Sequence, residues 1–339
     1  MTPRHRPALA VVTATQVASI VEGDRETCLD LVRRAYLAHD AGASANPHSS
    51  FLRLPGHPQS RIIALPAYLG GEFDLAGLKW IASYPDNVAH GLPRASAVVV
   101  LNDTATGYPY VCMEASIVSA TRTAASAVLA GEALAGGRSA DRVGFVGTGL
   151  IASHVYAFLR DLKWKVGGYR LFDLRREAAE QFAGRLSRDG AGDVAVVGDA
   201  AGAFADCDLV VIATVAGVPH LHDPALLAGA PAVLHLSLRD LAPALVLSAQ
   251  NLTDDIEHVM REQTSLHLAE QLCGHREFVD GTLVDLLAGR LRRSGERSVV
   301  FSPFGLGVLD LAVAGWVYER VTAAGGGHLA LDFFGAAMR

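Results

Sequence analysis

A glycine-rich turn between an apolar strand and a helix constrains the fold of this chain most. It follows the apolar residues 143–146 and matches the pattern G-x-G-x-x-A. In this pattern the first glycine makes a sharp turn, the second lets a pyrophosphate approach the backbone, and the alanine lets the helix pack closely on the strand. The free N–H groups and positive dipole end of the helix favour phosphate binding. We therefore predict a Rossmann-type turn whose cofactor-binding residues are Gly147, Thr148, Gly149, Leu150, Ile151 and Ala152.

An acidic residue stands where such a turn needs one. Asp173 ends the next expected strand, 21 positions after Ala152. Its carboxylate would accept hydrogen bonds from the ribose hydroxyls of the cofactor and repel a 2′-phosphate, which favours NAD over NADP. Two alternatives stay open: Asp173 caps the helix expected from Arg175, or Arg175 and Arg176 bind a 2′-phosphate.

The chain shows two patterns of secondary structure. From residue 142 onward, short apolar strands alternate with helices, which is typical of a parallel sheet covered on both faces. Before residue 115, extended segments follow one another across turns, as in an antiparallel sheet. Residues 115–134 form one Ala-rich helix, and a helix over residues 308–322 can return to the first part. The predicted class is α/β, a central Rossmann NAD-binding domain with a discontinuous α+β domain.

Composition and charge exclude several classes of protein. The 339 residues suggest about two domains of ~150 residues each. With 50% hydrophobic residues and a net charge of −6, the chain is not intrinsically disordered. Scattered basic residues argue against a nucleic-acid partner, and no apolar run reaches the roughly 20 residues of a membrane helix. The spacing of the four cysteines fits neither a disulfide framework nor a zinc site, and the N-terminus resembles no secretory signal, so we expect a cytoplasmic protein.

Three charged residues lie among apolar or small neighbours and are candidates for chemistry. Lys79 lies inside an apolar strand, where a desolvated lysine can transfer protons or bind a carboxylate. Arg122 lies on the Ala-rich helix, where its planar guanidinium suits a carboxylate or a phosphate. Asp240 follows a strand, at the sheet edge where α/β sites gather catalytic groups. Structural alternatives stay open: an edge lysine, a surface arginine, and an aspartate that caps a helix or pairs with Arg239.

Thr214 and the histidines complete the candidates. Thr214 ends an expected strand and either contacts the cofactor or is an ordinary strand-terminal threonine. The 13 histidines show no metal-ligand spacing, so we expect no metal site.

Together these segments resemble the ornithine cyclodeaminase and mu-crystallin family over nearly the whole chain. The resemblance implies a homodimer, in which residues 1–135 and 306–339 form a substrate-binding and dimerisation domain and residues 136–305 bind NAD. It rests on Gly77-Leu78-Lys79-Trp80, Ala120-Thr121-Arg122-Thr123-Ala124-Ala125, the glycine-rich turn, Asp240 and the segment from Phe304-Gly305 to Asp310.

The resemblance also implies roles for individual residues. Lys79 and Arg53 would bind the substrate carboxylate, with Arg61 as a competitor of Arg53. Asp240 would be the catalytic acid or base. Phe304 and Gly305 would contact the substrate, and Arg122, Thr123, Asp173, Thr214 and Ser237 would contact the cofactor.

Two departures from the ornithine cyclodeaminase pattern indicate a particular branch. Asp240 is not followed by Pro-Gly-Lys, and Arg94 replaces a common threonine, which suggests a substrate with a second anionic group. With residues 235–240 and 302–307, the chain is most similar to the N-(2-amino-2-carboxyethyl)-L-glutamate dehydrogenases. That branch implies NAD-dependent oxidative hydrolysis of this polycarboxylate to L-2,3-diaminopropionate and 2-oxoglutarate, for siderophore or antibiotic biosynthesis. Ornithine cyclodeaminase, ketimine reductase or amino-acid dehydrogenase, and a non-catalytic crystallin-like binding protein stay open.

Overall fold

The chain divides into two compact units. The computed structural model describes residues 8–331, 333 and 334, so residues 1–7 of the N-terminal segment that was compared with a secretory signal lie outside it. Unit 1 is formed by Met1–Arg122 and Leu306–Arg339, and unit 2 by Thr123–Gly305. The first border between the units lies inside helix α3 (Ser116–Ala135), whereas the sequence suggested one after residue 135.

Unit 1 contains a mainly antiparallel sheet. Its strands follow the order β16-β1-β7-β6-β5-β4-β2, with β3 also paired to β4. Among the described strands, β1 and β7 run parallel and the other pairs are antiparallel, as expected for this part of the chain. The strands are β1 (Leu9–Val12), β2 (Ser44–Ala45), β3 (Ser50–Arg53), β4 (Arg61–Leu69), β5 (Leu75–Ser83), β6 (Ala95–Asn102), β7 (Pro109–Glu114) and β16 (His328–Ala330).

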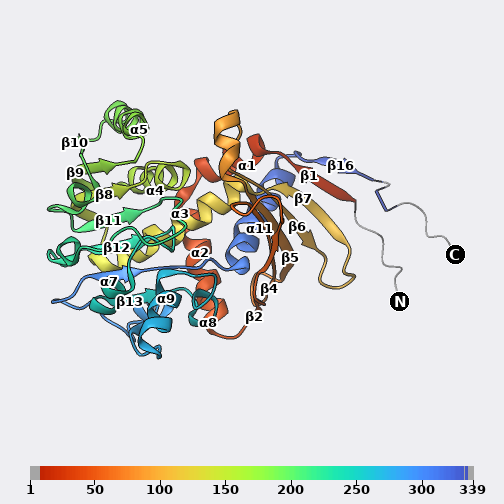
Figure 1. Ribbon diagram of the computed structural model, residues 1–339. Helices are drawn as coiled ribbons and strands as arrows, with labels where there is room; N and C mark the ends of the chain where they lie inside the picture. Colours follow the sequence, from red (N-terminus) through yellow and green to blue (C-terminus); the bar gives the residue numbers. More distant parts are fainter. Residues whose placement is uncertain (1–7, 332, 335–339) are drawn as a thin grey trace. The chain divides into compact units, whose positions relative to one another are not determined.

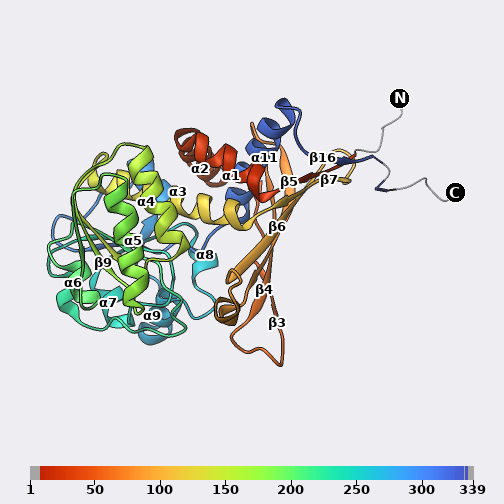
Figure 2. The ribbon, with the colours of Figure 1, turned by 90° about the horizontal axis from the view of Figure 1, so that it is seen from above.

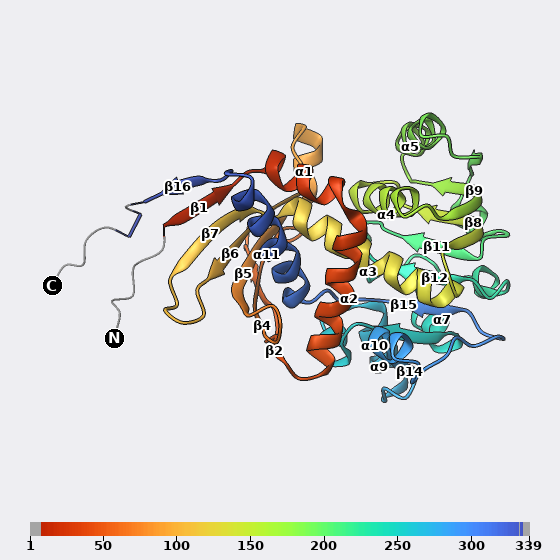
Figure 3. The ribbon, with the colours of Figure 1, turned by 180° about the vertical axis from the view of Figure 1, so that it is seen from behind.

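Helices cover one face of this sheet. Along β4, Leu65, Ala67 and Leu69 are buried and the intervening Tyr68 is exposed, which is the two-residue period of a half-buried strand. Helix α11 packs on β4, β5 and β6, with α2 and α1 beside it (Figure 2; Figure 3). The helical segments of this unit are α1 (Ala14–Gly23), α2 (Arg25–Asp40), the short η1 (Pro85–His90), the first part of α3, and α11 (Gly307–Ala323).

A glycine allows the close packing of α11. A Cβ at Gly77 would lie 3.0 Å from a methyl carbon of Leu311 and 2.3 Å from the carbonyl oxygen of Val100. Any larger side chain would therefore collide with the backbone of the neighbouring strand β6 and press on the side chain of Leu311. This glycine stands two residues before Lys79 on β5.

Unit 2 contains a parallel sheet, as the alternation of strands and helices predicted. Its order is β10-β9-β8-β11-β12-β15-β13-β14 (Figure 1). Strands β11, β12, β13 and β15 contain no exposed residue, so both faces of the sheet centre are covered. The strands are β8 (Ser139–Val146), β9 (Lys165–Phe172), β10 (Asp193–Val196), β11 (Leu209–Ile212), β12 (Ala232–His235), β13 (Gln250–Thr253), β14 (Val279–Thr282) and β15 (Val299–Phe301).

The helices of unit 2 are short apart from α3, α4 and α5. None of the described helices of the whole chain is long and apolar enough to span a membrane. After α3, the helices of unit 2 are α4 (Leu150–Asp161), α5 (Arg176–Arg188), α6 (Ala200–Phe204), η2 (Pro224–Leu227), α7 (Pro243–Ser248), α8 (Ile256–Val259), α9 (Ser265–Cys273) and α10 (Leu283–Leu287).

Candidate active site

The glycine-rich turn joins β8 to α4 and leaves room for a phosphate. Gly147 has a φ of +88°, and a Cβ there would lie 2.5 Å from the carbonyl oxygen of Ala213. Gly149 precedes the first residue of α4, and a Cβ there would meet no atom within 4 Å. The side chain of Ala152 is fully buried. Thr148, Leu150 and Ile151 complete the turn, so the N-terminus of α4 faces open space with free N–H groups, as a dinucleotide pyrophosphate requires.

Asp173 ties this turn to the next helix. It lies one residue beyond β9, and its Oδ2 accepts hydrogen bonds from the backbone N–H (2.9 Å) and hydroxyl (3.0 Å) of Thr148. Its Oδ1 accepts from the N–H of Arg175 at 3.0 Å, but Arg175 is the N-cap residue of α5, which has no side-chain cap, so the alternative that Asp173 caps this helix is wrong. A carboxylate has about four acceptor positions, and one therefore remains for a ribose hydroxyl. Arg176, which the sequence left open as a partner for a 2′-phosphate, forms an ion pair with Glu180 at 2.9 Å.

Asp240 lies at the carboxyl edge of the same sheet and is fully buried. Its Oδ1 accepts from Nε2 of His220 (3.0 Å) and from the hydroxyl of Thr214, and its Oδ2 from Nε2 of His235 (3.0 Å) and the hydroxyl of Ser237 (2.5 Å). Burial alone would raise the pKa of Asp240, but the hydrogen bonds from the histidines and Ser237 outweigh it and hold that pKa far below its usual range. Asp240 is therefore an anion at neutral pH.

This arrangement changes the setting of several predicted residues. Thr214 and Ser237, which the sequence predicted to contact the cofactor, both donate hydrogen bonds to Asp240. Arg239 donates to the carbonyl oxygen of Glu262, at 3.0 Å from Nε and 2.6 Å from Nη2. The histidines that contact Asp240 are His220 and His235. Neither histidine was singled out from the sequence. The spacing of His235 five positions before Asp240, at the end of a strand, was the available signal.

Lys79 and Arg122 lie together in unit 1 on a residue that the sequence did not single out. Asp310, in the first turn of α11, is fully buried; its Oδ2 lies 2.7 Å from Nζ of Lys79 and its Oδ1 2.9 Å from Nε of Arg122. Nζ of Lys79 also donates to the hydroxyl of Ser119 at 3.1 Å. Burial and then the nearby Arg122 lower the pKa of Lys79 to about 8, although Asp310 opposes the shift. The group carries two cations and one anion.

Three further arginines gather at one end of the unit 1 sheet. Arg53 of β3 stands opposite Arg61 of β4, which stands opposite Ser83 of β5. Arg94, just before β6, donates to the hydroxyl of Ser83 at 2.7 Å. Burial and the positive charge of Arg61 both lower the pKa of Arg94. We call Arg53, Arg61 and Arg94 the arginine cluster; its geometry brings both competing residues, Arg53 and Arg61, to the same place.

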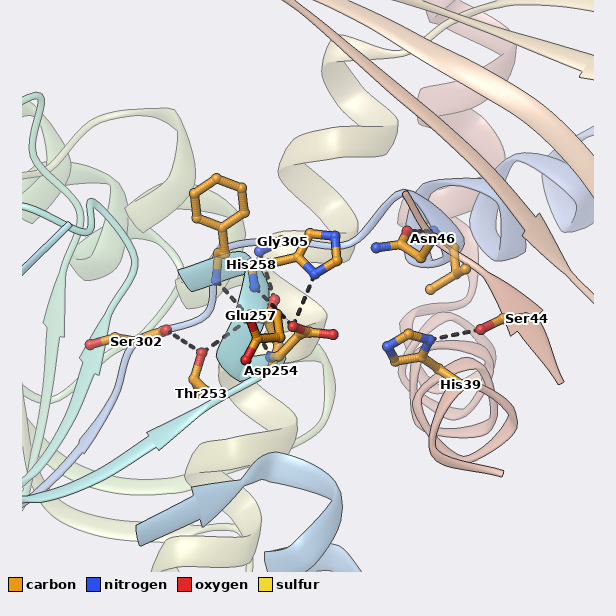
Figure 4. Close-up of polar contacts among 12 residues, drawn as sticks. His39, Ser44, Asn46, Thr253, Asp254, Glu257, His258, Ser302 and Gly305 are labelled. Atoms are coloured by element: carbon orange, nitrogen blue, oxygen red, sulfur yellow. Dashed lines mark hydrogen bonds and ion pairs between the residues drawn. The ribbon is translucent and has the colours of Figure 1, made fainter. Parts of the chain in front are cut away.

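The segment that contains Phe304 and Gly305 is held by a buried aspartate of unit 2. Asp254 accepts hydrogen bonds from the N–H of Phe304 at 2.8 Å and of Gly305 at 2.6 Å (Figure 4). Next to it, the hydroxyl of Thr253 donates to the carbonyl oxygen of Ser302 at 3.0 Å. The hydroxyl of Ser302 in turn lies 3.0 Å from Nδ1 of His235. These bonds connect the segment to the surroundings of Asp240.

Among the described residues, no group of three or more histidine, cysteine, aspartate or glutamate side chains could hold a metal ion.

The predicted site residues fall into two sets, one in each unit. Unit 1 holds Arg53, Lys79, Arg94 and Arg122, and unit 2 holds Thr123, the glycine-rich turn, Asp173, Thr214, Ser237, Asp240, Phe304 and Gly305.

The fold and the turn define a class: an α/β protein with a Rossmann-type dinucleotide-binding unit and a second unit rich in buried or clustered cations. A family model described as the ornithine cyclodeaminase/mu-crystallin family matches residues 10–325. The chain belongs to this family.

Individual relatives agree with this placement. The chain is 28% identical over 301 residues, 86% of its length, to the N-((2S)-2-amino-2-carboxyethyl)-L-glutamate dehydrogenase of Staphylococcus aureus (strain NCTC 8325 / PS 47), of which the match covers 89%. The solved structure of CmnK is 28% identical, with a TM-score of 0.84 over 97% of this chain and 99% of that one. An archaeal alanine dehydrogenase dimer with bound NAD is 25% identical, with a TM-score of 0.84 over 95% and 98%.

Proposed function

We propose that this protein is an N-(2-amino-2-carboxyethyl)-L-glutamate dehydrogenase. As a member of its family it is an NAD-dependent oxidoreductase that acts on a CH–NH group. The finer assignment rests on the arginine cluster. The conjugate carries three carboxylates, and a substrate with one carboxylate would not need Arg53, Arg61 and Arg94 in addition to Lys79 and Arg122. The relative from Staphylococcus aureus supports the same substrate.

The proposed reaction consumes water and NAD⁺. NAD⁺, when bound, supplies the acceptor for the hydride that leaves the glutamate α-carbon. Water adds to the resulting imine, the carbon–nitrogen bond breaks, and 2-oxoglutarate, L-2,3-diaminopropionate, NADH and one proton are released. The protein positions the reactants and moves protons. We assign the proton transfers to the acid–base centre formed by Asp240 and its hydrogen-bond partners.

Lys79 and Arg122 keep N–H donors beyond those that their described partners use. An ammonium group has three N–H donors; Lys79 gives one of them to Ser119 and forms an ion pair with Oδ2 of Asp310. Arg122 gives its Nε–H to Asp310, and among the described residues its Nη atoms have no partner. We propose that Lys79, with Arg53, binds the α-carboxylate, that Arg94 binds another carboxylate, and that Arg122 and Thr123 contact the cofactor phosphates.

The cofactor contacts of unit 2 follow from the turn. We propose that residues 147–152 bind the pyrophosphate and that the remaining acceptor position of Asp173 binds a ribose hydroxyl. The free backbone at Gly149 supports the close approach of a phosphate. We propose that Thr214 and Ser237 reach the cofactor from beside Asp240 and that Phe304 and Gly305 contact the substrate.

We also propose that the protein is a homodimer that uses unit 1 as its dimerisation domain. Trp80, Val98 and Tyr68 are 38–40% exposed, on three adjacent strands of the unit 1 sheet. An apolar sheet surface of this kind favours association, and the archaeal alanine dehydrogenase is a dimer. Light scattering after size exclusion would test the dimer.

The four cysteines are free, which supports a reducing compartment such as the cytoplasm.

One experiment separates the candidate functions. The purified protein is mixed with NAD and the synthetic conjugate, and NADH absorbance and 2-oxoglutarate are measured. We expect both to appear in equal amounts. NAD reduction by alanine without turnover of the conjugate would indicate an amino-acid dehydrogenase. Proline formation from ornithine without net NADH, again with an inert conjugate, would indicate a cyclodeaminase and refute the proposal.

A further inference from the structure

We propose that His220 is the catalytic residue that exchanges protons with the substrate, and that Asp240 is a positioning residue that acts through it. This inference rests on the proposed function and specifies its acid–base centre.

The carboxylate of Asp240 is poorly placed to receive a proton itself. It has no exposed surface, and four hydrogen-bond donors occupy its two oxygens. A carboxylate offers about four acceptor positions, so a water or an amine would first have to displace one of these donors. Its strongly lowered pKa agrees with this, because an anion so well solvated by the protein is a weak base.

His220 has the access that Asp240 lacks. Its side chain is 41% exposed, and its Nε2 lies 3.0 Å from Oδ1 of Asp240. Among the described residues, Nδ1 of His220 has no hydrogen-bond partner. When Nε2–H is donated to the carboxylate, Nδ1 carries the basic lone pair. A histidine oriented by a buried aspartate is a standard arrangement for general acid–base catalysis.

The backbone holds the same pair together. The N–H groups of His220 and Leu221 both donate to the carbonyl oxygen of Asp240 at 2.9 Å, and the N–H of Ala242 donates to Leu221 at 2.9 Å. Leu221 and Leu241 form an isolated parallel bridge. The imidazole is thus fixed to Asp240 through its ring and through its main chain, which limits the entropy lost when it reacts.

The second histidine on Asp240 serves as the internal comparison. His235 is fully buried; its Nε2 lies 3.0 Å from Asp240 and its Nδ1 3.0 Å from the hydroxyl of Ser302. Both ring nitrogens are therefore engaged inside the protein. His235 supports the carboxylate from behind, while His220 is the one imidazole of the two that a substrate can reach.

The position of His220 relative to the nucleotide turn supports the assignment. Both β11, which precedes His220, and β12, which precedes Asp240, end at the same edge of the parallel sheet as β8, which enters the turn. Gly147 lies against the carbonyl group of Ala213, directly after β11. Ligands of open parallel sheets bind at this edge.

The proton balance is simple. Neutral His220 accepts a proton from the water that adds to the iminium carbon, which gives a carbinolamine. The imidazolium then donates that proton to the amine nitrogen. The carbon–nitrogen bond breaks as the hydroxyl proton passes to His220, leaving the ketone and the free amine. His220 finally releases one proton to solvent, which is the proton of the overall reaction.

Four variants test the inference. His220→Ala and His220→Gln should lower kcat by about 10²–10⁴-fold with unchanged NAD affinity, since general acid–base groups contribute this much. Added imidazole should restore part of the turnover of His220→Ala, whose cavity opens to solvent, and little of that of His220→Gln. His222→Ala, an exposed histidine two residues away, should keep wild-type turnover.

The fourth variant tests the positioning role. Asp240→Asn should lower kcat more than it raises KM. It should also move the acid limb of the kcat profile to lower pH, because loss of the adjacent charge disfavours imidazolium. Among the described residues, His235 is a further titratable group on this carboxylate, 3.0 Å from Oδ2.

The outcomes distinguish this inference from the proposed function. Wild-type turnover of the conjugate by both His220 variants would refute the inference and leave the function intact. An inert conjugate would refute the function; the same variants would then be compared on the substrate that is turned over, ornithine or alanine. Absence of turnover on every substrate would refute both.

Discussion

The buried ion cluster of unit 1 makes a prediction about stability that depends only on charge balance. Lys79 and Arg122 flank Asp310 at 2.7 and 2.9 Å, and the side chains are 1%, 9% and 0% exposed. The wild-type cluster has a net charge of +1. Asp310→Asn leaves two buried cations without a counter-ion, whereas Lys79→Met leaves Arg122 and Asp310 as a neutral pair. The two variants each remove one charge, but only Asp310→Asn should lower the unfolding free energy.

The expected sizes follow from known costs. Removal of one partner of a buried ion pair, which leaves an uncompensated charge, costs about 3–5 kcal/mol, and Asp310→Asn should lower the unfolding free energy of unit 1 by this amount. Lys79 has a pKa of about 8 instead of 10.5, so its charged form is disfavoured in the folded chain by a net of roughly 3 kcal/mol, which already includes the attraction of Asp310. Lys79→Met removes this net cost. Its unfolding free energy should be unchanged or raised by up to about 3 kcal/mol.

The pH dependence gives an independent check. Between the folded value of about 8 and the unfolded value of 10.5, the unfolded chain holds the proton on Lys79 and the folded chain has lost it. Stability therefore rises with pH across this window from this group. The rise should be absent in Lys79→Met, because methionine does not titrate.

Tryptophan fluorescence can follow unit 1 separately. The chain has three tryptophans, of which Trp80 and Trp316 belong to unit 1 and Trp164 to unit 2. In a Trp164→Phe background, guanidinium unfolding monitored by fluorescence reports on unit 1, which avoids treating a two-unit chain as one transition. If Lys79→Met lost as much stability as Asp310→Asn, the charge-balance reasoning would be wrong.

Three further predictions concern ligands. Gly149→Ala should fold normally, since its Cβ meets no atom within 4 Å, but lose NAD binding by calorimetry because the methyl blocks the pyrophosphate; Gly147→Ala, with φ +88°, should also lose stability. Asp173→Asn should reduce the preference for NAD over NADP, measured as the ratio of kcat/KM values, by about tenfold or more; an unchanged ratio would contradict the ribose assignment. Arg94→Gln should raise KM for the conjugate by roughly 10–100-fold while NAD affinity stays constant, and an unaltered KM would exclude Arg94 from the substrate site.

The parts of the fold that the sequence predicts are those encoded locally. The phosphate turn lies within ten residues, so its glycines, strand and helix are visible together, and α4 begins directly after Gly149. Strand β13 was missed because its sequence Gln-Asn-Leu-Thr looks polar. In the structure it is fully buried, and Nδ2 of Asn251 donates to the carbonyl oxygens of Val246, Ala249 and Phe278.

The candidate site shows the same limit. Lys79, Arg122 and Asp240 stood out because a charge in apolar or small surroundings is costly. Their partners did not. Asp310 lies far from Lys79 in the sequence and meets it only because α11 packs on β5, and an acidic residue at the start of a helix has an ordinary local explanation.

The missing partners decide what each charged residue can do. The sequence alone suggests that Asp240 is a general base. In the structure two histidines and two hydroxyls hydrogen-bond to its carboxylate and stabilise the anion, and the imidazole of one of them, His220, is exposed. The sequence alone suggests that Lys79 is an ammonium group that binds carboxylates. In the structure Asp310 compensates one positive charge, and because Arg122 pairs with the same aspartate the cluster keeps a net charge of +1. In each unit the sequence therefore locates the charge that is costly to bury, and the three-dimensional packing determines which atom carries the proton or the positive charge to a ligand.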